Sequence, residues 1–286
     1  MLAKVQVLRK ALALLPLIRR NIEEPETRKV LAYMSTPTSA TIKIGFRNGP
    51  KVSVTRTTLI TVLHLFDLNK KLRVIGEKEI IELSEFCLGL DLKLRSALGL
   101  EYTNFSAGGR FGVKEAFLYM LVRKYRPNRL IETGVAQGVS SSVILKAITV
   151  NGEGHLTSID LPTYSRAGRM NADGVLDRAH VDPSLGPGWV VPKDLRTNWS
   201  LILGDSKEKL KELGGDIDFF FHDSEHSYSH MMLEYEWALG HMRSGVICSD
   251  DISWNRAFMD FRKNHGLKEI EWAKDLDFGA VSVENY

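Results

Sequence analysis

Residues 129–141 read RLIETGVAQGVSS: an apolar segment, a turn with two glycines, and the beginning of a helical pattern. The apolar segment at 129–132 predicts a buried strand, and the pattern of residues 140–150 predicts a helix. Gly134 and Gly138 allow a turn at a helix N-terminus to approach a ligand closely. Their G-x-x-x-G spacing differs from the G-x-G-x-x-G of dinucleotide-binding folds. The stretch therefore predicts a strand–turn–helix unit, whose turn is either a ligand-binding turn or a plain tight connection.

The alternation of helix and strand continues from about residue 111 to the end of the chain. Helices are predicted over 114–125, 140–150, 207–213, 227–242 and 254–265, and strands over 129–132, 155–160, 201–203, 217–222, 245–249, 268–273 and 278–283. Such alternation predicts an α/β domain over 111–286, with a mostly parallel sheet covered by helices on both faces. The last two strands predict an antiparallel edge. Residues 161–200 form one long irregular insertion after a strand end, a position typical of lids and substrate loops.

Residues 1–110 have a different pattern and are interpreted as an N-terminal α+β accessory region. Alternating apolar residues at 42–46 and 52–54 flank Asn48-Gly49, a pair that favours the tight turn of a β-hairpin. Residues 2–20 have apolar side chains at helical spacing with basic residues around them. This amphipathic helix either makes peripheral contact with a membrane surface or packs on its own domain or on a second subunit of a homo-oligomer.

The composition excludes several classes of protein. Of the 286 residues, 44% are hydrophobic and 26% are charged, which excludes a disordered chain. The 38 basic and 35 acidic residues give a net charge of +3, too small for a dedicated nucleic-acid-binding protein. The two cysteines, Cys87 and Cys248, form no disulfide framework and suit a reducing, cytoplasmic location.

Acidic residues follow the next two predicted strands. Asp160 ends the strand after the glycine turn, and Asp205 with Ser206 follows the strand after that. Ligands of open α/β sheets bind outside the carboxyl ends of the strands, where an acidic side chain accepts hydrogen bonds from ribose hydroxyls. Each residue also suits an ordinary helix N-cap. Together they predict a crevice for a nucleotide-like ligand.

Five motifs of residues 112–286 resemble those of class I S-adenosylmethionine (SAM)-dependent methyltransferases. They are ETGVAQGVSS at 132–141, SID at 158–160, LGDS at 203–206, DFFFHDSEHSY at 218–228 and RSGVICSDDI at 243–252. The chain is most similar to metal-dependent small-molecule O-methyltransferases of the catechol and caffeoyl-CoA type and to relatives from sugar and antibiotic tailoring. This resemblance implies a Rossmann-like, seven-stranded sheet with SAM lying over the ends of its first strands. The residues it implies at the cofactor are Glu132 and Gly134 near the methionine part, Asp160 on the ribose, Asp205 and Ser206 near the adenine, and also Gln137, Gly138, Ser140 and Asp223.

Three carboxylates follow two neighbouring predicted strands. Asp223 ends the most apolar strand, and Asp250 and Asp251 end the next one. Because parallel strands lie about 5 Å apart, the three side chains are expected to converge. A divalent cation relieves their repulsion, and oxygen ligands suit Mg²⁺, Mn²⁺ or Ca²⁺. The matching positions bind Mg²⁺ in the catechol-type enzymes, which have asparagine where this chain has Asp251, and Asp251 alternatively caps the following helix.

His226 lies three residues after Asp223, where the catechol-type enzymes have a lysine that acts as a base. With an ordinary pKa near 6.5, histidine is suited to accept a hydroxyl proton near neutral pH. The alternative is an exposed histidine at the start of a helix. We therefore predict His226 and Asp223 as catalytic residues. The HDSEH segment lacks the single-helix spacing of zinc proteases.

The sequence is compatible with two functions, one enzymatic and one non-catalytic. The first is transfer of a methyl group from SAM to a hydroxyl of a small acceptor, assisted by a divalent metal. A sugar or glycoside is the preferred acceptor, and a catechol-like phenol is the second. The other function is a non-catalytic protein of the same fold that binds SAM or a nucleotide and acts as an assembly module.

Overall fold

The structure, a computed structural model, describes residues 41–44, 52–55, 73–98, 113–165, 167–177, 179–270 and 277–284. The chain divides into two units, residues 1–103 and 104–286. The boundary predicted near residue 110 falls outside the described residues and stays a prediction. The amphipathic helix predicted over 2–20 also lies outside them, together with its predicted contacts with a membrane or a second subunit.

The first unit contains the predicted β-hairpin strands and one long helix. Strand β1 (Thr41–Ile44) pairs antiparallel with β2 (Val52–Thr55). The register sets Ile42 opposite Val54 and Ile44 opposite Val52. Helix α5 (Glu77–Leu98) follows. The Asn48-Gly49 turn lies between the two strands, outside the described residues.

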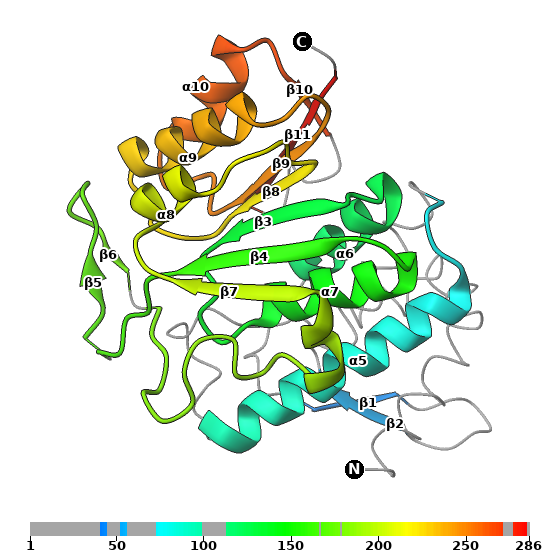
Figure 1. Ribbon diagram of the computed structural model, residues 1–286. Coiled ribbons are helices and arrows are strands. Elements are labelled where there is room, and N and C mark those ends of the chain that lie inside the picture. The colour runs from blue at the N-terminus through cyan, green and yellow to red at the C-terminus, as the bar shows by residue number, and fades with distance from the viewer. Residues whose placement is uncertain are drawn as a thin grey trace, which may run out of the picture. The chain divides into compact units, whose positions relative to one another are not determined.

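The second unit is built on a seven-stranded sheet, which confirms the predicted Rossmann-like fold (Figure 1). The strands are β3 (Arg129–Thr133), β4 (His155–Asp160), β7 (Trp199–Leu203), β8 (Phe219–His222), β9 (Gly245–Asp250), β10 (Lys268–Glu269) and β11 (Phe278–Val283). They are arranged in the order β10-β11-β9-β8-β3-β4-β7, and the five strands from β9 to β7 are parallel. The carboxyl ends of β3, β4, β7 and β8 therefore meet at one edge.

The prediction that the last two strands form an antiparallel edge is confirmed. β11 is antiparallel to both of its neighbours, and β10 beyond it is the outermost strand (Figure 1). Five of the six residues of β11 are buried, whereas the two residues of β10 are exposed or half-buried. A strand that is buried on both faces belongs inside the sheet, and the short polar strand suits the edge.

Helices cover both faces of the sheet. α6 (Val113–Tyr125) and α7 (Val139–Asn151) lie on one face, and α8 (Ser206–Glu212), α9 (Tyr228–Gly240) and α10 (Ala257–Asn264) lie on the other (Figure 1). Each face of the sheet packs against its helices in a separate apolar core. β8 contributes to both cores because its successive side chains point to opposite faces. Phe220 joins the cluster under α9 and α10, and Phe221 packs against Phe278 on the opposite face, with the ring centroids 6.0 Å apart.

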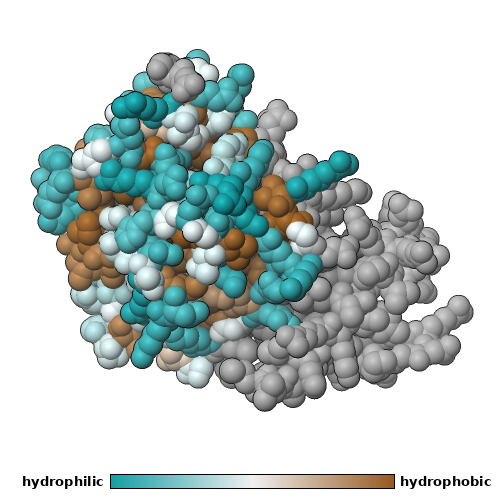
Figure 2. Space-filling model, turned by 45° about the vertical axis from the view of Figure 1, so that its right-hand side comes forward, coloured by the Kyte–Doolittle hydropathy of each residue, from teal (hydrophilic) through white to brown (hydrophobic). Residues whose placement is uncertain are grey.

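The surface of the described residues is mixed. On the face shown in Figure 2, hydrophobic residues form separate patches among hydrophilic ones. Met170 and Leu203 are the most exposed large hydrophobic side chains described, at 60% and 54%. None of the helices in the described part of the chain has the length and apolar character that crossing a bilayer requires.

Candidate functional site

The glycine turn between β3 and α7 has a backbone that only glycine fits at its first position. Gly134 has a φ of +83°, and a Cβ added there would lie 1.8 Å from the carbonyl oxygen of Asp223. The turn therefore packs directly on the chain that leaves β8. Ala136 and Gly138 also have positive φ values, of 45° and 93°. Gly134 thus brings the ends of β3 and β8 close enough to share one pocket, whereas Gly138 approaches Gly188 of the insertion.

Asp160, at the end of β4, holds this turn with one oxygen and leaves the other free. Its Oδ1 accepts hydrogen bonds from the backbone N–H groups of Val135 and Ala136, at 2.8 and 3.4 Å. Its Oδ2 is buried and has no hydrogen-bond partner. Burial raises the pKa of Asp160, and the two backbone bonds oppose that rise. Because two N–H groups of the turn already bind Asp160, the turn is better suited to a ligand hydroxyl at Oδ2 than to a phosphate.

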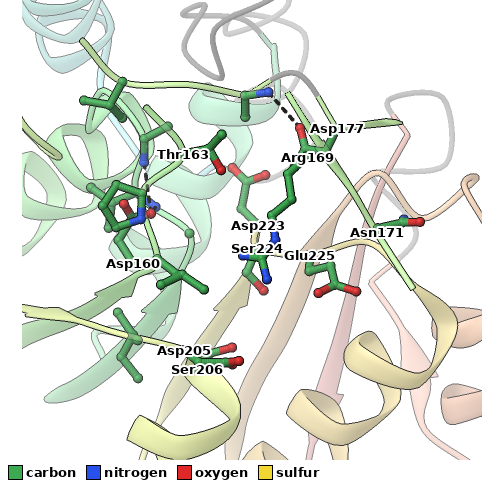
Figure 3. Close-up of a pocket in the computed structure, with 18 of the residues that line it drawn as sticks. Asp160, Thr163, Arg169, Asn171, Asp177, Asp205, Ser206, Asp223, Ser224 and Glu225 are labelled. Carbon is green, nitrogen blue, oxygen red and sulfur yellow. Dashed lines mark hydrogen bonds between the residues drawn. The ribbon is translucent and has the colours of Figure 1, made fainter. Parts of the chain in front are cut away.

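A pocket opens beside Asp160 and encloses about 810 Å³, including space open to solvent. In Figure 3, Asp205 and Ser206 lie on one side of it, and Asp177 and Arg169 lie on the opposite side. The carboxylates that line it are Asp160, Asp177, Asp205, Asp223 and Glu225. Of the described lining residues, Arg169 is the one arginine or lysine. The pocket is therefore acidic, which favours a ligand that carries positive charge.

Five of the residues predicted at the cofactor line this pocket, and four do not. The lining residues are Gly134, Asp160, Asp205, Ser206 and Asp223; the others are Glu132, Gln137, Gly138 and Ser140. Asp205 also caps α8, since its carboxylate accepts a hydrogen bond from the backbone N–H of Lys207 at 2.9 Å. Asp205 therefore both caps α8 and lines the pocket.

Glu132 is fully buried beneath the first turn of α7. Its carboxylate accepts hydrogen bonds from the hydroxyls of Ser140, Ser141 and Ser158, each at 2.6 Å. Burial raises the pKa of Glu132 to about 7, and the three serine bonds oppose that rise. Glu132 and Ser140 therefore join β3, β4 and α7 behind the pocket wall, and their predicted contact with the cofactor stays a prediction.

Gln137 of the glycine turn forms hydrogen bonds to the long insertion, residues 161–200. Its side chain donates to the carbonyl oxygen of His180 at 2.7 Å and accepts from the indole N–H of Trp189. The backbone N–H of Gly188 donates to the carbonyl oxygen of Ala136 at 2.9 Å. The insertion also contains the hairpin β5 (Arg169–Met170) and β6 (Leu176–Asp177) and the 3₁₀ helix η2 (Lys193–Asn198), and both hairpin strands supply lining residues.

The three predicted metal ligands meet a lysine that the sequence did not indicate. Lys114, in the first turn of α6, contacts the Oδ2 of Asp250, whose side chain is 6% exposed. Burial raises the pKa of Asp223 well above its ordinary value and that of Asp251 to about 7, and neighbouring carboxylates add to both shifts. Asp251 does not cap α10, because Arg256 is the N-cap residue of that helix.

The donor set does not fit a divalent metal. In the described part of the chain, no group of three or more His, Cys, Asp or Glu side chains is arranged to hold a metal ion. The ammonium of Lys114 contacts the carboxylate of Asp250, which a metal would need as a ligand. Magnesium therefore stays a prediction that this arrangement does not favour.

His226 is buried with a free ring nitrogen. It is 7% exposed, which rules out the alternative of an exposed histidine at a helix start. Its Nε2 has no hydrogen-bond partner and lies 3.9 Å from Oδ1 of Asp223 and 3.8 Å from Oδ2 of Asp251. Burial lowers the pKa of His226 well below its ordinary value, and the charges of His222 and Lys114 lower it further. The ring is therefore neutral at neutral pH and able to accept a proton.

Glu234, which the sequence analysis missed, is the centre of a buried polar cluster beneath the pocket. Its carboxylate accepts from five side chains: Thr133, Ser206, Ser224, His222 and His230. Burial raises the pKa of Glu234, but the charge and hydrogen bonds of the two histidines outweigh burial and hold the pKa well below its ordinary value. The spacing of His230 and Glu234, four residues apart on one helix, was a signal for this contact.

Replacing Glu234 by glutamine is expected to lower the free energy of unfolding by about 3 kcal/mol at neutral pH, because buried donors lose a charged acceptor. The folded-state pKa of Glu234 lies below 4.5, so its stabilisation is complete above that value and is lost as the pH falls further. Urea unfolding measures both effects. The control is Glu236→Gln on the same helix, at a side chain that is 46% exposed and paired with His265. Equal losses in the two variants would contradict the prediction.

The sequence comparison identifies a family domain over the strands and helices that form the site. Residues 131–252 match the family model described as a methyltransferase domain. No curated protein has significant similarity to the sequence.

Several solved structures are similar to the chain. The O-methyltransferase TomG from Streptomyces achromogenes, involved in tomaymycin synthesis and in complex with SAM, is 15% identical; the match covers 69% of this chain and 90% of that one, with a TM-score of 0.47. The O-methyltransferase from Bacillus cereus, in complex with S-adenosylhomocysteine, is 16% identical over 68% of this chain and 90% of that one, with a TM-score of 0.44. The Podospora anserina methyltransferase PaMTH1 is 13% identical over 92% of this chain and 97% of that one, with a TM-score of 0.43.

The family match begins in β3 and ends just after β9, so it includes the glycine turn and the strand ends at Asp160 and Asp223. The seven-stranded sheet has the architecture that the sequence motifs imply. Residues 131–252 are therefore similar to a methyltransferase domain.

Proposed function

We propose that this chain transfers a methyl group from SAM to a hydroxyl oxygen of a small acceptor. The observation that carries the proposal is the buried, unpartnered Oδ2 of Asp160 beside the glycine turn. A buried acceptor without a donor is rare in proteins, and a ribose hydroxyl supplies the missing donor. The Asp160 carboxylate would therefore bind the ribose, as the sequence motifs predict.

The rest of the pocket also fits SAM. Gly134, Val135 and Ala136 of the glycine turn line the pocket directly, beside Asp223. Asp205 and Ser206 line the part expected to hold the adenine. The carboxylate-rich lining favours the positive sulfonium, which supplies an electrophilic methyl group when SAM is bound.

Asp223 and His226 would act on the acceptor. Asp223 lines the pocket and also lies 3.9 Å from Nε2 of His226, so it connects the cofactor pocket to the proton acceptor. A hydroxyl held at this point would give its proton to the neutral Nε2 of His226. The oxygen then gains the electron density that attack on a methyl carbon requires. Positioning by the pocket walls would supply much of the remaining acceleration.

The preferred acceptor is a sugar or glycoside with neighbouring hydroxyls, and a catechol-like phenol is the second. Asn171, Asp177 and Glu225 line the pocket from the hairpin and from the segment after β8. The Nδ2 of Asn171 is buried and has no hydrogen-bond partner. Carboxylates and a free amide suit a molecule with several hydroxyl groups, because each hydroxyl both donates and accepts.

Titration of SAM into the protein and its Asp160→Asn variant tests the cofactor site. Asparagine keeps an oxygen for the turn but replaces the free acceptor by a donor, so the affinity for SAM should fall about 10- to 100-fold. Asp194→Asn, at an exposed position of η2, is the matched control and should bind SAM as the parent does. If the parent binds no SAM, or if Asp160→Asn binds it equally well, the proposed site is wrong.

Turnover then separates catalysis from simple binding. The parent is incubated with SAM and a panel of glycosides and catechols, and formation of S-adenosylhomocysteine is measured. Product formation supports the methyltransferase. Tight SAM binding without turnover on any acceptor would favour the alternative, a non-catalytic binding protein of the same fold.

A further inference from the structure

The carboxylates after β8 and β9 have a cation of their own, supplied by α6. Lys114 lies in the first turn of that helix, and its Nζ contacts Oδ2 of Asp250. The Lys114 side chain is 34% exposed and that of Asp250 is 6% exposed. The ion pair therefore sits at the boundary between the core and the space in front of the strand ends, where an acceptor would bind.

Lys114 brings a positive charge to the carboxylates at these strand ends. Its ammonium contacts Asp250 directly, and Asp251 follows Asp250 in the chain.

We propose that Lys114 takes the place of a divalent cation at the acceptor site, so that the methyl transfer of this chain needs no metal. The inference rests on the proposed function. The ammonium contacts Asp250, and with three N–H donors it has further donors to offer an acceptor oxygen. Such donors stabilise negative charge that develops on an oxygen, as an oxyanion hole does.

The step balances without a metal. The acceptor hydroxyl gives its proton to Nε2 of His226, and its oxygen forms the new bond to the methyl carbon. The bond between that carbon and sulfur breaks, and its electron pair stays on sulfur, which leaves neutral S-adenosylhomocysteine. Lys114 keeps its proton throughout and acts as an electrostatic and hydrogen-bonding group.

Geometry also makes Lys114 an obstacle to metal binding. With Asp250 held by the ammonium, Asp223 and Asp251 remain, and their oxygens lie 3.9 and 3.8 Å from the buried Nε2 of His226. Removal of the ammonium would leave three carboxylates without a counter-ion. Their present arrangement holds no metal site among the described residues, but without the ammonium they can close around a divalent cation, which relieves their repulsion. The Lys114→Met variant is therefore expected to gain a metal site that the parent lacks.

Binding of Mn²⁺, followed by electron paramagnetic resonance, tests this inference on the full chain. The parent should leave millimolar Mn²⁺ free, whereas Lys114→Met should bind one ion and lose it again when Asp250→Asn is added. Lys114→Arg keeps a cation and should exclude Mn²⁺, which preserves the test if the methionine variant is unstable. Lys193→Met, at an exposed position of η2, is the control and should behave as the parent.

Turnover with the accepted glycoside or catechol provides the second readout. A chelator should leave the rate of the parent unchanged, and Lys114→Met should be about 100-fold slower, the usual effect of losing one oxyanion donor. Stoichiometric Mn²⁺ binding by the parent, or loss of its turnover on chelation, would overturn the inference and return the site to a metal. Failure of SAM to bind would instead refute the proposed function, and the Mn²⁺ result does not depend on that outcome.

Discussion

Replacing His226 by alanine is expected to lower kcat about 100- to 10,000-fold, the range usual for loss of a general base. The affinity for SAM should change little, because His226 is absent from the described lining of the cofactor pocket. The physical reason is the free Nε2, which is buried, neutral and close to Asp223 and Asp251. The variant loses the proton acceptor and keeps the pocket.

The measurement is steady-state transfer of labelled methyl to an accepted glycoside or catechol, together with SAM titration. His155→Ala is the matched control, because His155 is an exposed histidine at the opposite end of the parallel strands, where its Nε2 contacts the hydroxyl of Ser200. The control should keep the parent's kcat. A loss smaller than tenfold in His226→Ala would show that another group takes the proton.

The pH profile gives an independent check on His226. Burial lowers its pKa below 6.5, and the base works in its neutral form. The rate should therefore hold as the pH falls to 6.5 and decline only at lower pH, when the ring becomes protonated. Because burial raises the pKa of Asp251 to about 7, the profile is recorded in an Asp251→Asn background. A decline centred at 6.5 or above in that background would contradict the assignment.

Replacing Gly134 by alanine is expected to lower the free energy of unfolding by about 3 to 5 kcal/mol, from a left-handed backbone and an overpacked contact together. The added Cβ would lie 1.8 Å from the Asp223 carbonyl oxygen, so the ends of β3 and β8 must separate. SAM binding should be lost along with stability, since both strand ends form the pocket. Urea unfolding and SAM titration measure the two effects.

Gly152→Ala separates the clash from the backbone strain. Gly152 has a nearly equal φ of +78°, but a Cβ added there would have no atom within 4 Å. Its replacement should cost about 1 to 2 kcal/mol, the left-handed backbone alone. It should also leave SAM binding intact, because Gly152 ends α7 away from the glycine turn. Similar losses in both variants would show that the close approach to Asp223 is unimportant.

Local patterns determined most of the fold. Each strand of the sheet that the periodicity predicts is present, because buried parallel strands are apolar throughout and amphipathic helices repeat every three to four residues. Which of the two closing strands is outermost was not predictable in the same way. Whether a closing strand lies at the edge or inside depends on which partner buries its two faces, and β11 meets Phe117 and Phe221 through Phe278.

The sequence by itself determined the glycine turn, the strand-end acids Asp160 and Asp223 and the histidine at 226, because each follows a strand whose carboxyl end is set by the fold class. Only the tertiary structure decided which neighbours these residues have. It buried Glu132 under three serines, joined Gln137 to the insertion and placed Lys114 on Asp250. Those contacts join residues far apart in the chain, and packing between layers, which leaves no periodic trace in the sequence, selects them.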